Sequence, residues 1–130
     1  MSDTDEFRYV RPADFAALQA AARGERWQQK LLDRQSGGEA VGVVLIRTPA
    51  GGGSPEGLHT HTHEQVFYVL EGRMGVEVDG QTFEVTPGSV VVFPKGVPHR
   101  NWTADGQPTL HLAINVPAPV PGAKNTTAVS

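Results

Sequence analysis

Short β-prone runs separated by turn residues make up most of the chain after residue 24, and this alternation limits the possible folds more than any other feature. The runs span residues 26–33, 40–48, 66–70, 74–78, 81–86, 89–93 and 109–116. Parallel strands need helical crossovers of about a dozen residues or more, and the segments between these runs show no helical periodicity. The pattern therefore predicts an all-β fold, either a sandwich or a barrel.

Two local features refine this prediction. The alanine-rich segment Pro12–Ala22 begins with proline, which suits the first turn of a helix, and stops before Gly24, so one short N-terminal helix is expected. Apolar residues alternate with small or charged ones in Met74–Val78, and Asp79–Gly80 then supplies the residue pair that a type I′ turn requires. Residues 74–86 are therefore predicted to form a β-hairpin.

The 130 residues are enough for one globular domain. We expect an N-terminal helix and strand extension over residues 1–34, a β barrel over 35–117 and a loose C-terminal tail over 118–130. The tail begins with several prolines and ends in small polar residues, so we expect it to contribute no regular ladder hydrogen bonds.

Composition excludes several kinds of function. The chain has no cysteine, so disulfides, zinc ribbons and thiol nucleophiles are excluded, and a metal would need histidine, carboxylate or amide ligands. The formal net charge of −3 argues against a nucleic-acid partner, and no apolar stretch is long enough to span a membrane. The acidic opening Met1–Glu6 lacks the features of a secretion signal, so a cytoplasmic location is expected.

Three histidines alternate within five residues, at His59, His61 and His63. In an extended chain, side chains two residues apart lie on the same side, so either neighbouring pair of these imidazoles could grip a metal ion. The alternative is a polar loop that is merely rich in histidine.

Two ordered patterns surround these histidines. The first consists of Gly53, His59, His61, Gln65 and Gly72, and the second of Gly88, Pro94, Gly96 and His99. With these spacings the sequence resembles the cupin superfamily, whose two motifs are a glycine, His-x-His, glutamate, glycine series and a glycine, Pro-x-Gly, histidine, asparagine series. The resemblance covers residues 53–103 and implies a double-stranded β-helix, which is a small barrel of the jelly-roll kind.

The resemblance also implies a divalent transition metal, whether iron, manganese, nickel, copper or zinc. The family's ligands fall on His59, His61, Gln65 and His99. His63 lies one pleat further on and is not expected to be a ligand. The chain departs from the family pattern at Gln65, where most cupins have glutamate, and at Thr103, where the second motif usually has asparagine. Glu64 could replace Gln65 only if the strand were bulged there.

A ligand set of three imidazoles and one amide is neutral, so the charge of a divalent ion stays uncompensated and an anionic substrate is expected. The pleat turns Phe67, Asn101 and Thr103 toward the pocket. Asn101 either contacts substrate or satisfies nearby loop backbone. Arg47 either meets the anion at the barrel mouth or is a solvated charge at a strand end. His111 either turns inward, as an acid or base near the metal, or faces outward.

The other face of the strand 66–70 carries Val66, Tyr68 and Leu70, so we expect another sheet or another subunit to cover it. Small single-domain cupins commonly dimerise through N-terminal segments, and the resemblance therefore implies a homodimer that uses residues 26–33.

These features favour a metal-dependent enzyme that acts on a small anionic organic molecule, with a dioxygenase-type oxidoreductase preferred. The alternatives are a Lewis-acid isomerase, lyase or cyclase of the same fold, and a non-catalytic module that binds a small molecule. A degenerate cupin without metal is a further alternative, but the three family histidines argue against it, because unpaired imidazoles clustered in a pocket make poor packing.

Overall fold

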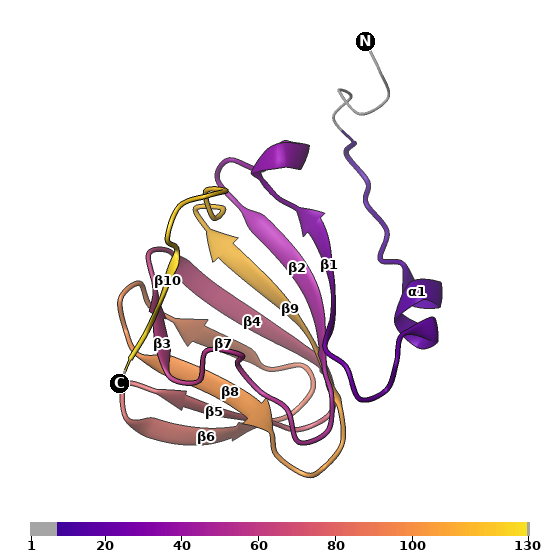
Figure 1. Ribbon diagram of the computed structural model, residues 1–130, viewed down its shortest axis with the longest axis vertical. Helices are drawn as coiled ribbons and strands as arrows, with labels where there is room; N and C mark the ends of the chain where they lie inside the picture. The colour runs from indigo at the N-terminus through magenta and orange to yellow at the C-terminus, as the bar shows by residue number, and fades with distance from the viewer. Residues whose placement is uncertain (1–7, 130) are drawn as a thin grey trace.

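The computed structural model describes residues 8–129, which are organised around two antiparallel β-sheets of five strands each (Figure 1). The first sheet consists, in spatial order, of β1 (Trp27–Leu32), β2 (Gly42–Thr48), β9 (Thr109–Val116), β4 (Glu64–Glu71) and β7 (Val90–Phe93). The second consists of β10 (Thr126–Ala128), β3 (His59–His61), β8 (His99–Thr103), β5 (Met74–Val78) and β6 (Gln81–Val85). The predicted all-β jelly-roll architecture is confirmed.

The main hydrophobic core lies between the two sheets. Its fully buried side chains come from both: Ile46, Phe67, Val69, Met74, Val76, Val85, Phe93 and Ala113. In β4 the buried positions alternate, with Gln65, Phe67 and Val69 on the inner face, because successive side chains of a strand point to opposite faces.

The N-terminal helix α1 (Phe15–Ala20) covers part of the outer face of the first sheet (Figure 1). Its Leu18 packs against Leu45 and Leu110, and Leu70 joins this second cluster. The expectation that another sheet or subunit covers this face is therefore wrong for the part of it that contains Leu70. Tyr68, further along the same face, is 39% exposed.

The helix is shorter than the predicted segment Pro12–Ala22. The side chain of Asp14 accepts a hydrogen bond from the backbone N–H of Ala17 and caps its start, and the backbone is already extended at Ala21. The guanidinium of Arg47 donates to the carbonyls of Leu18 and Ala22, so a side chain from β2 satisfies backbone acceptors at the point where the helix ends.

The hairpin turn between β5 and β6 is as predicted. Asp79 and Gly80 have φ angles of 50° and 79°, the two successive positive values of a type I′ turn.

The C-terminal segment differs from its prediction. Thr126–Ala128 form β10, which pairs antiparallel with β3, so that Thr126 lies opposite His61. The expectation of a tail without ladder hydrogen bonds is wrong for these residues, because they follow the prolines and keep their backbone donors.

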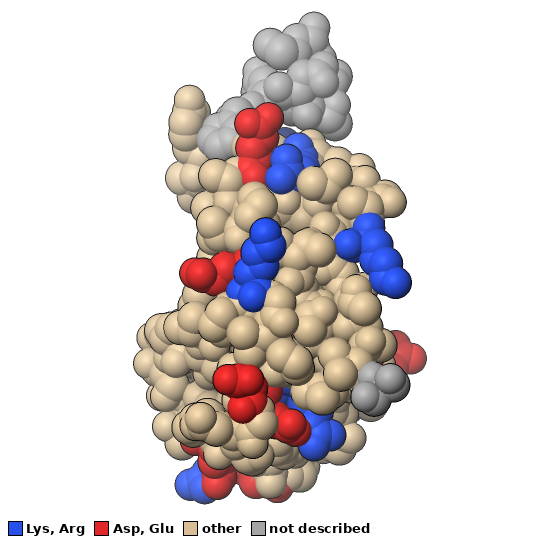
Figure 2. Space-filling view, turned by 90° about the vertical axis from the view of Figure 1, so that its left-hand side faces the viewer, with Lys and Arg blue, Asp and Glu red and all other residues tan. Residues whose placement is uncertain are grey.

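No helix within residues 8–129 is both long enough and apolar enough to cross a membrane. Basic and acidic side chains are interspersed over the face of the protein that Figure 2 shows. The acidic opening Met1–Glu6 lies outside the described residues. The cytoplasmic location and the homodimer stay predictions.

Candidate functional site

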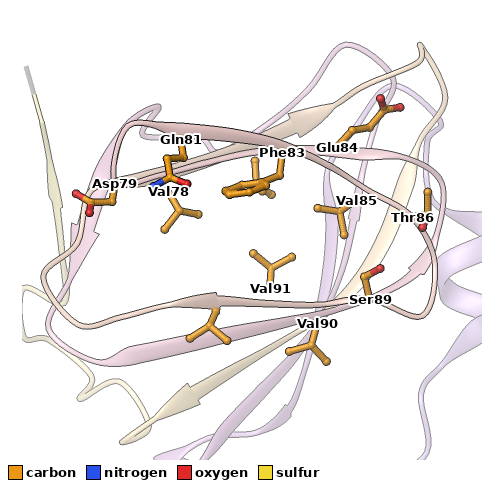
Figure 3. A pocket seen from close by; sticks show the side chains of 12 residues that line it. Val78, Asp79, Gln81, Phe83, Glu84, Val85, Thr86, Ser89, Val90 and Val91 are labelled. Atoms are coloured by element: carbon orange, nitrogen blue, oxygen red, sulfur yellow. The ribbon is translucent and has the colours of Figure 1, made fainter.

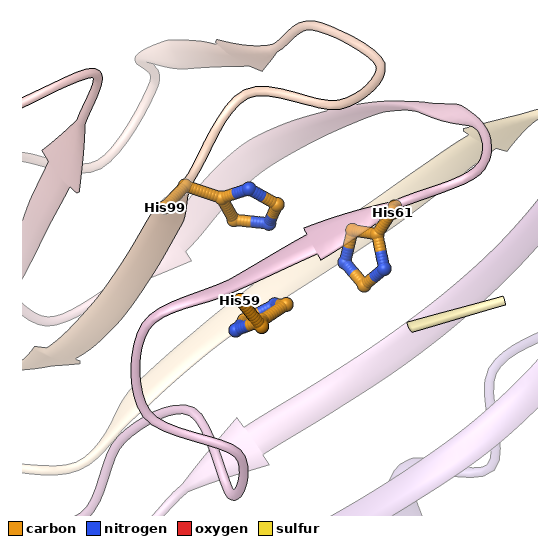
Figure 4. A group of neighbouring side chains, drawn as sticks. All are labelled: His59, His61 and His99. Carbon is orange, nitrogen blue, oxygen red and sulfur yellow. The ribbon is translucent and has the colours of Figure 1, made fainter. Parts of the chain in front are cut away.

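Two neighbouring strands of the second sheet bring three of the histidines together. The register of β3 and β8 places His59 directly opposite His99. His61 lies two residues further along β3, on the same side of the strand as His59. Figure 4 shows the three imidazole rings grouped around a common point between these strands.

The spacing of these rings suits a metal ion. One ring nitrogen from each of the three histidines lies within 4.8 Å of the others. The ring centroids are 4.4 Å apart for His59 and His99, and 4.7 Å apart for His59 and His61. Neutral imidazole is the most common protein ligand for divalent zinc, copper, iron and nickel.

Hydrogen bonds to the far side of each ring fix its orientation. The Nδ1–H groups of His59 and His99 donate to backbone carbonyl oxygens two residues earlier, at 2.6 and 3.0 Å. Nδ1 of His61 hydrogen-bonds to the hydroxyl of Thr126 at 3.0 Å. The Nε2 atoms remain for another partner, and that of His99 is buried without one. Metal-binding histidines usually have this arrangement, so the residues present fit a divalent ion.

The protonation of the cluster agrees with a ligand role. Burial, followed by the charges of the neighbouring imidazoles, lowers the pKa of His61 to about 3. Burial also lowers the pKa of His99 to about 4. Both rings are therefore neutral near pH 7, and neutral imidazole is the form that binds metal.

Gln65 enters the same region from β4 of the first sheet. Its side chain is buried, and its Nε2 donates to Oδ1 of Asn115 at 2.9 Å, which leaves its Oε1 as the free acceptor. The register of β4 against β9 is regular here, and Glu64 is exposed on the other face. The bulge that would have brought Glu64 inside is therefore absent at this point of β4. Gln65 as a ligand stays a prediction.

His63 lies in the bend between β3 and β4, outside the group of three. Its ring stacks on that of His61, with centroids 4.5 Å apart and an interplanar angle of 20°. Burial lowers its pKa. His63 therefore packs behind His61.

The strand register turns His111 into the barrel. His111 lies opposite Ile46 in β2 and Val69 in β4, and both of these belong to the main core. Burial, followed by the charge of Arg26, lowers the pKa of His111 to about 3, and neither ring nitrogen has a hydrogen-bond partner. Its cross-strand partners show that His111 faces inward. The leucines on either side of it in β9 face outward, as the alternation of a strand requires.

Several of these residues border a cavity of about 240 Å³, which we call the histidine cavity; His63 and His99 are not among the residues that line it. Six residues singled out from the sequence line it: His59, His61, Gln65, Phe67, Asn101 and His111. The rings of Phe67 and His111 lie 4.2 Å apart, so an apolar ring forms the wall beside the buried imidazole. Most of the lining side chains are polar or charged, and Phe67 is one of the few apolar ones, so the cavity suits a small molecule with several polar groups.

A family model described as a cupin domain matches residues 44–115, which is more than half of the chain. The chain belongs to the cupin family. The resemblance seen in the two sequence motifs is therefore confirmed.

Individual relatives extend this finding. An uncharacterized protein of Methanocaldococcus jannaschii is 35% identical over 66 residues, which are 50% of this cupin and 53% of that protein, so the chain spans about half the length of this curated relative. The polyketide cyclase RemF from Streptomyces resistomycificus is 33% identical, with a TM-score of 0.65 over 78% of this chain and 70% of that one. A cupin-like protein from Thermotoga maritima has a TM-score of 0.69 at 20% identity, over 82% and 77% of the chains, and shows the shared fold.

Two of the predicted pocket residues lie elsewhere in this cupin. Thr103 accepts a hydrogen bond from the backbone N–H of Gly51, and Arg47 is held by backbone carbonyls near α1; neither is among the residues that line the histidine cavity. The pleat placed Thr103, and the position at a strand end placed Arg47. Neither kind of local reasoning could predict a partner in a distant loop or helix. Asn101 does line the cavity, while its Oδ1 accepts from the hydroxyl of Ser54 at 2.6 Å. Both roles considered for Asn101 are thus compatible with its place.

Other lining residues were not singled out from the sequence. Arg26, Ser54 and Glu56 reach the histidine cavity from loops before β1 and before β3. The one sequence signal nearby was the motif glycine Gly53, where an added Cβ would lie 2.4 Å from the carbonyl oxygen of Asn101. Only glycine lets this loop approach β8 so closely.

A second hollow, which we call the β6–β7 groove, has a volume of about 500 Å³. It lies between the edge strands β6 and β7, and Figure 3 shows side chains such as Phe83, Val85 and Val91 projecting toward the gap. Its lining is chiefly valine and contains no histidine. The groove is larger than the histidine cavity but lacks groups that could bind a metal through nitrogen.

Proposed function

We propose that this cupin is a metal-dependent enzyme that acts on a small anionic organic molecule. The observation that carries the proposal is the set of three imidazoles, each held through Nδ1, whose remaining nitrogens converge beside the histidine cavity. In a purely structural cluster, the buried Nε2 of His99 would normally have a hydrogen-bond partner within the protein, and it has none.

A divalent ion held by His59, His61 and His99, with Oε1 of Gln65 as a fourth ligand, would act as a Lewis acid on an oxygen atom of the substrate. Asn115 keeps Gln65 oriented for this role by accepting from its amide nitrogen. Phe67 forms an apolar wall beside the reacting region.

His111 is the residue that we assign to catalysis. Its pKa is about 3, so His111 is a neutral imidazole in the free protein. Neutral imidazole with such a pKa is a weak base, but it can donate a hydrogen bond through one ring nitrogen. A neutral imidazole can thus stabilise negative charge as it develops on substrate oxygen. A bound anion would raise the pKa of His111 and improve its capacity to accept a proton.

Two reaction classes fit this site. The 33% identity to a polyketide cyclase supports a Lewis-acid reaction such as cyclisation, isomerisation or elimination, which needs no oxidant. The dioxygenase-type reaction preferred from the sequence is the second candidate, and it is supported by the neutral imidazole and amide set, which suits redox-active iron, nickel or copper.

The first experiment is elemental analysis of the protein, prepared without a histidine tag, beside H99A, H99Q and the groove variant F83A. We expect about one transition-metal ion per chain in the wild type and in F83A. Loss of one ligand should weaken metal binding by more than about 100-fold, since even loss of an outer hydrogen-bond partner costs 10- to 100-fold. Circular dichroism checks that both His99 variants fold.

Absence of metal from the wild-type protein, even after incubation with divalent ions, would contradict the proposal and favour a non-catalytic binding module. If metal is present, oxygen uptake with catechols and β-diketones separates the two reaction classes. Turnover without oxygen supports the Lewis-acid class, and oxygen consumption coupled to substrate loss supports the dioxygenase.

A further inference from the structure

Arg26 lies at the rim of the histidine cavity. It directly precedes β1, is exposed to solvent, and lines the cavity together with His59, His61 and His111. Of the described residues that line this cavity, it is the only lysine or arginine. Its position was not predicted as part of the site.

The guanidinium of Arg26 is poorly satisfied by the protein. One N–H donates to Oε1 of Gln28 at 2.8 Å, and Gln28 is a neutral partner that also lines the cavity. Arginine carries five N–H donors and stays charged, so most of its capacity is unused. Arg47 provides the contrast, because its guanidinium donates to the carbonyls of Leu18 and Ala22.

The guanidinium charge of Arg26 is partly removed from water and acts on the residues around the cavity. Burial lowers the pKa of its guanidinium, which shows that the charge is partly removed from water, and Glu56 opposes this shift. The positive charge of Arg26 in turn helps to lower the pKa of His111, so it acts across the cavity. An anion at this place would recover the lost solvation of the guanidinium.

The identity of the anion follows from these neighbours. A carboxylate matches the planar fork of arginine and carries one negative charge. A phosphate dianion carries more charge and would be repelled more strongly by Glu56, which lines the same cavity. The volume of about 240 Å³ restricts the ligand to a small molecule.

We infer that Arg26, with Gln28 beside it, binds a carboxylate of the substrate, so that this cupin acts on small carboxylic acids. The inference rests on the proposed function, since a second oxygen of the same molecule would face the three histidines. Arg26 would then fix which end of the substrate points toward His59, His61 and His99.

The test compares matched pairs of probes: acetate with acetamide, lactate with lactamide, and benzoate with benzamide. Their binding is titrated by nuclear magnetic resonance in the metal-free and the zinc-loaded protein. Charge-assisted hydrogen bonds predict that at least one carboxylate binds about 10- to 100-fold more tightly than its amide. R26Q should abolish this preference and R26K should keep part of it, because lysine retains the charge without the fork.

R23Q is the matched control, since Arg23 is an exposed arginine that does not line the cavity. It should keep the full preference. A preference that survives in R26Q, or its absence from the wild type for all three pairs, would overturn the inference. Metal content is measured in the same samples, so failure of the metal proposal is recognised separately, and the metal-free titration still decides the role of Arg26.

Discussion

The histidine cavity and the β6–β7 groove are two openings associated with the same pair of sheets, and they differ in almost every chemical respect. The groove is about twice as large, at about 500 Å³ against about 240 Å³. Yet the smaller cavity contains the imidazoles with strongly lowered pKa values and the buried nitrogens without partners. In this fold the candidate site is marked by its inward-facing imidazole nitrogens, and the volume of an opening does not identify it.

The difference arises from strand pairing. His59 of β3 lies opposite His99 of β8, and His111 of β9 lies opposite the core residue Ile46, so the ladder registers turn these three side chains inward. β6 and β7 are edge strands, and their side chains include the half-exposed Phe83, Val90 and Val92. The candidate site is thus built on strands that are paired on both sides, and the groove lies between two edge strands.

The largest expected effect compares the packing behind the histidine cavity with the packing at the β6–β7 groove. Phe93 is 1% exposed and packs against Phe67 and His99, at centroid distances of 4.7 and 4.3 Å. F93A should lower the free energy of unfolding by about 3–5 kcal/mol, because it leaves a cavity in the core. F83A removes a ring that is 50% exposed and should cost about 1 kcal/mol or less.

Urea denaturation of the metal-free proteins measures both changes. Similar losses in the two variants would contradict the comparison, because they would show that Phe83 is covered in solution.

How far the sequence could predict the fold and the site depends on the range of the interaction concerned. The hairpin at Asp79–Gly80 and the alternation along β4 were predictable because a few consecutive residues determine them. The pleat alone left two pairs open, His59 with His61 and His61 with His63, and the resemblance to cupins selected the first pair and added His99.

Other features depend on partners far away in the chain. The inward direction of His111 is decided by its pairing with Ile46 and Val69, which no local pattern encodes. Arg47 was misplaced because its acceptors are carbonyls of the N-terminal helix. Arg26 carried no signal at all, since its place depends on how β1 joins the sheet.

The second prediction sharpens the comparison by testing the support behind a ligand. Thr126 in β10 hydrogen-bonds to Nδ1 of His61, whereas its neighbour Thr127 is exposed. T126V should weaken metal binding by about 10- to 100-fold, because the ring of His61 loses the partner that orients it. T127V is the matched control and should bind metal like the wild type. Competition with a chelator of known affinity gives both values, and equal affinity in T126V would show that β10 does not support the site.

The smallest expected effect concerns the acid sensitivity that the buried imidazoles confer. His111 has a pKa of about 3 in the folded protein, against about 6.5 when unfolded. Between these values the unfolded state binds the additional proton. The free energy of unfolding of the metal-free protein should therefore fall as the pH is lowered from about 6.5, and it should be insensitive to this group at higher pH.

Substitution of His111 isolates its share of this slope from that of the carboxylates, which also titrate in acid. Each excess proton in the unfolded state contributes about 1.4 kcal/mol per pH unit, so H111Q should flatten the profile between pH 6 and pH 4 by up to that amount. F83A, in the β6–β7 groove, should leave the slope unchanged because it removes no titratable group. An H111Q profile parallel to that of the wild type would mean that His111 is hydrated in solution, and the histidine cavity would then be as open to water as the groove.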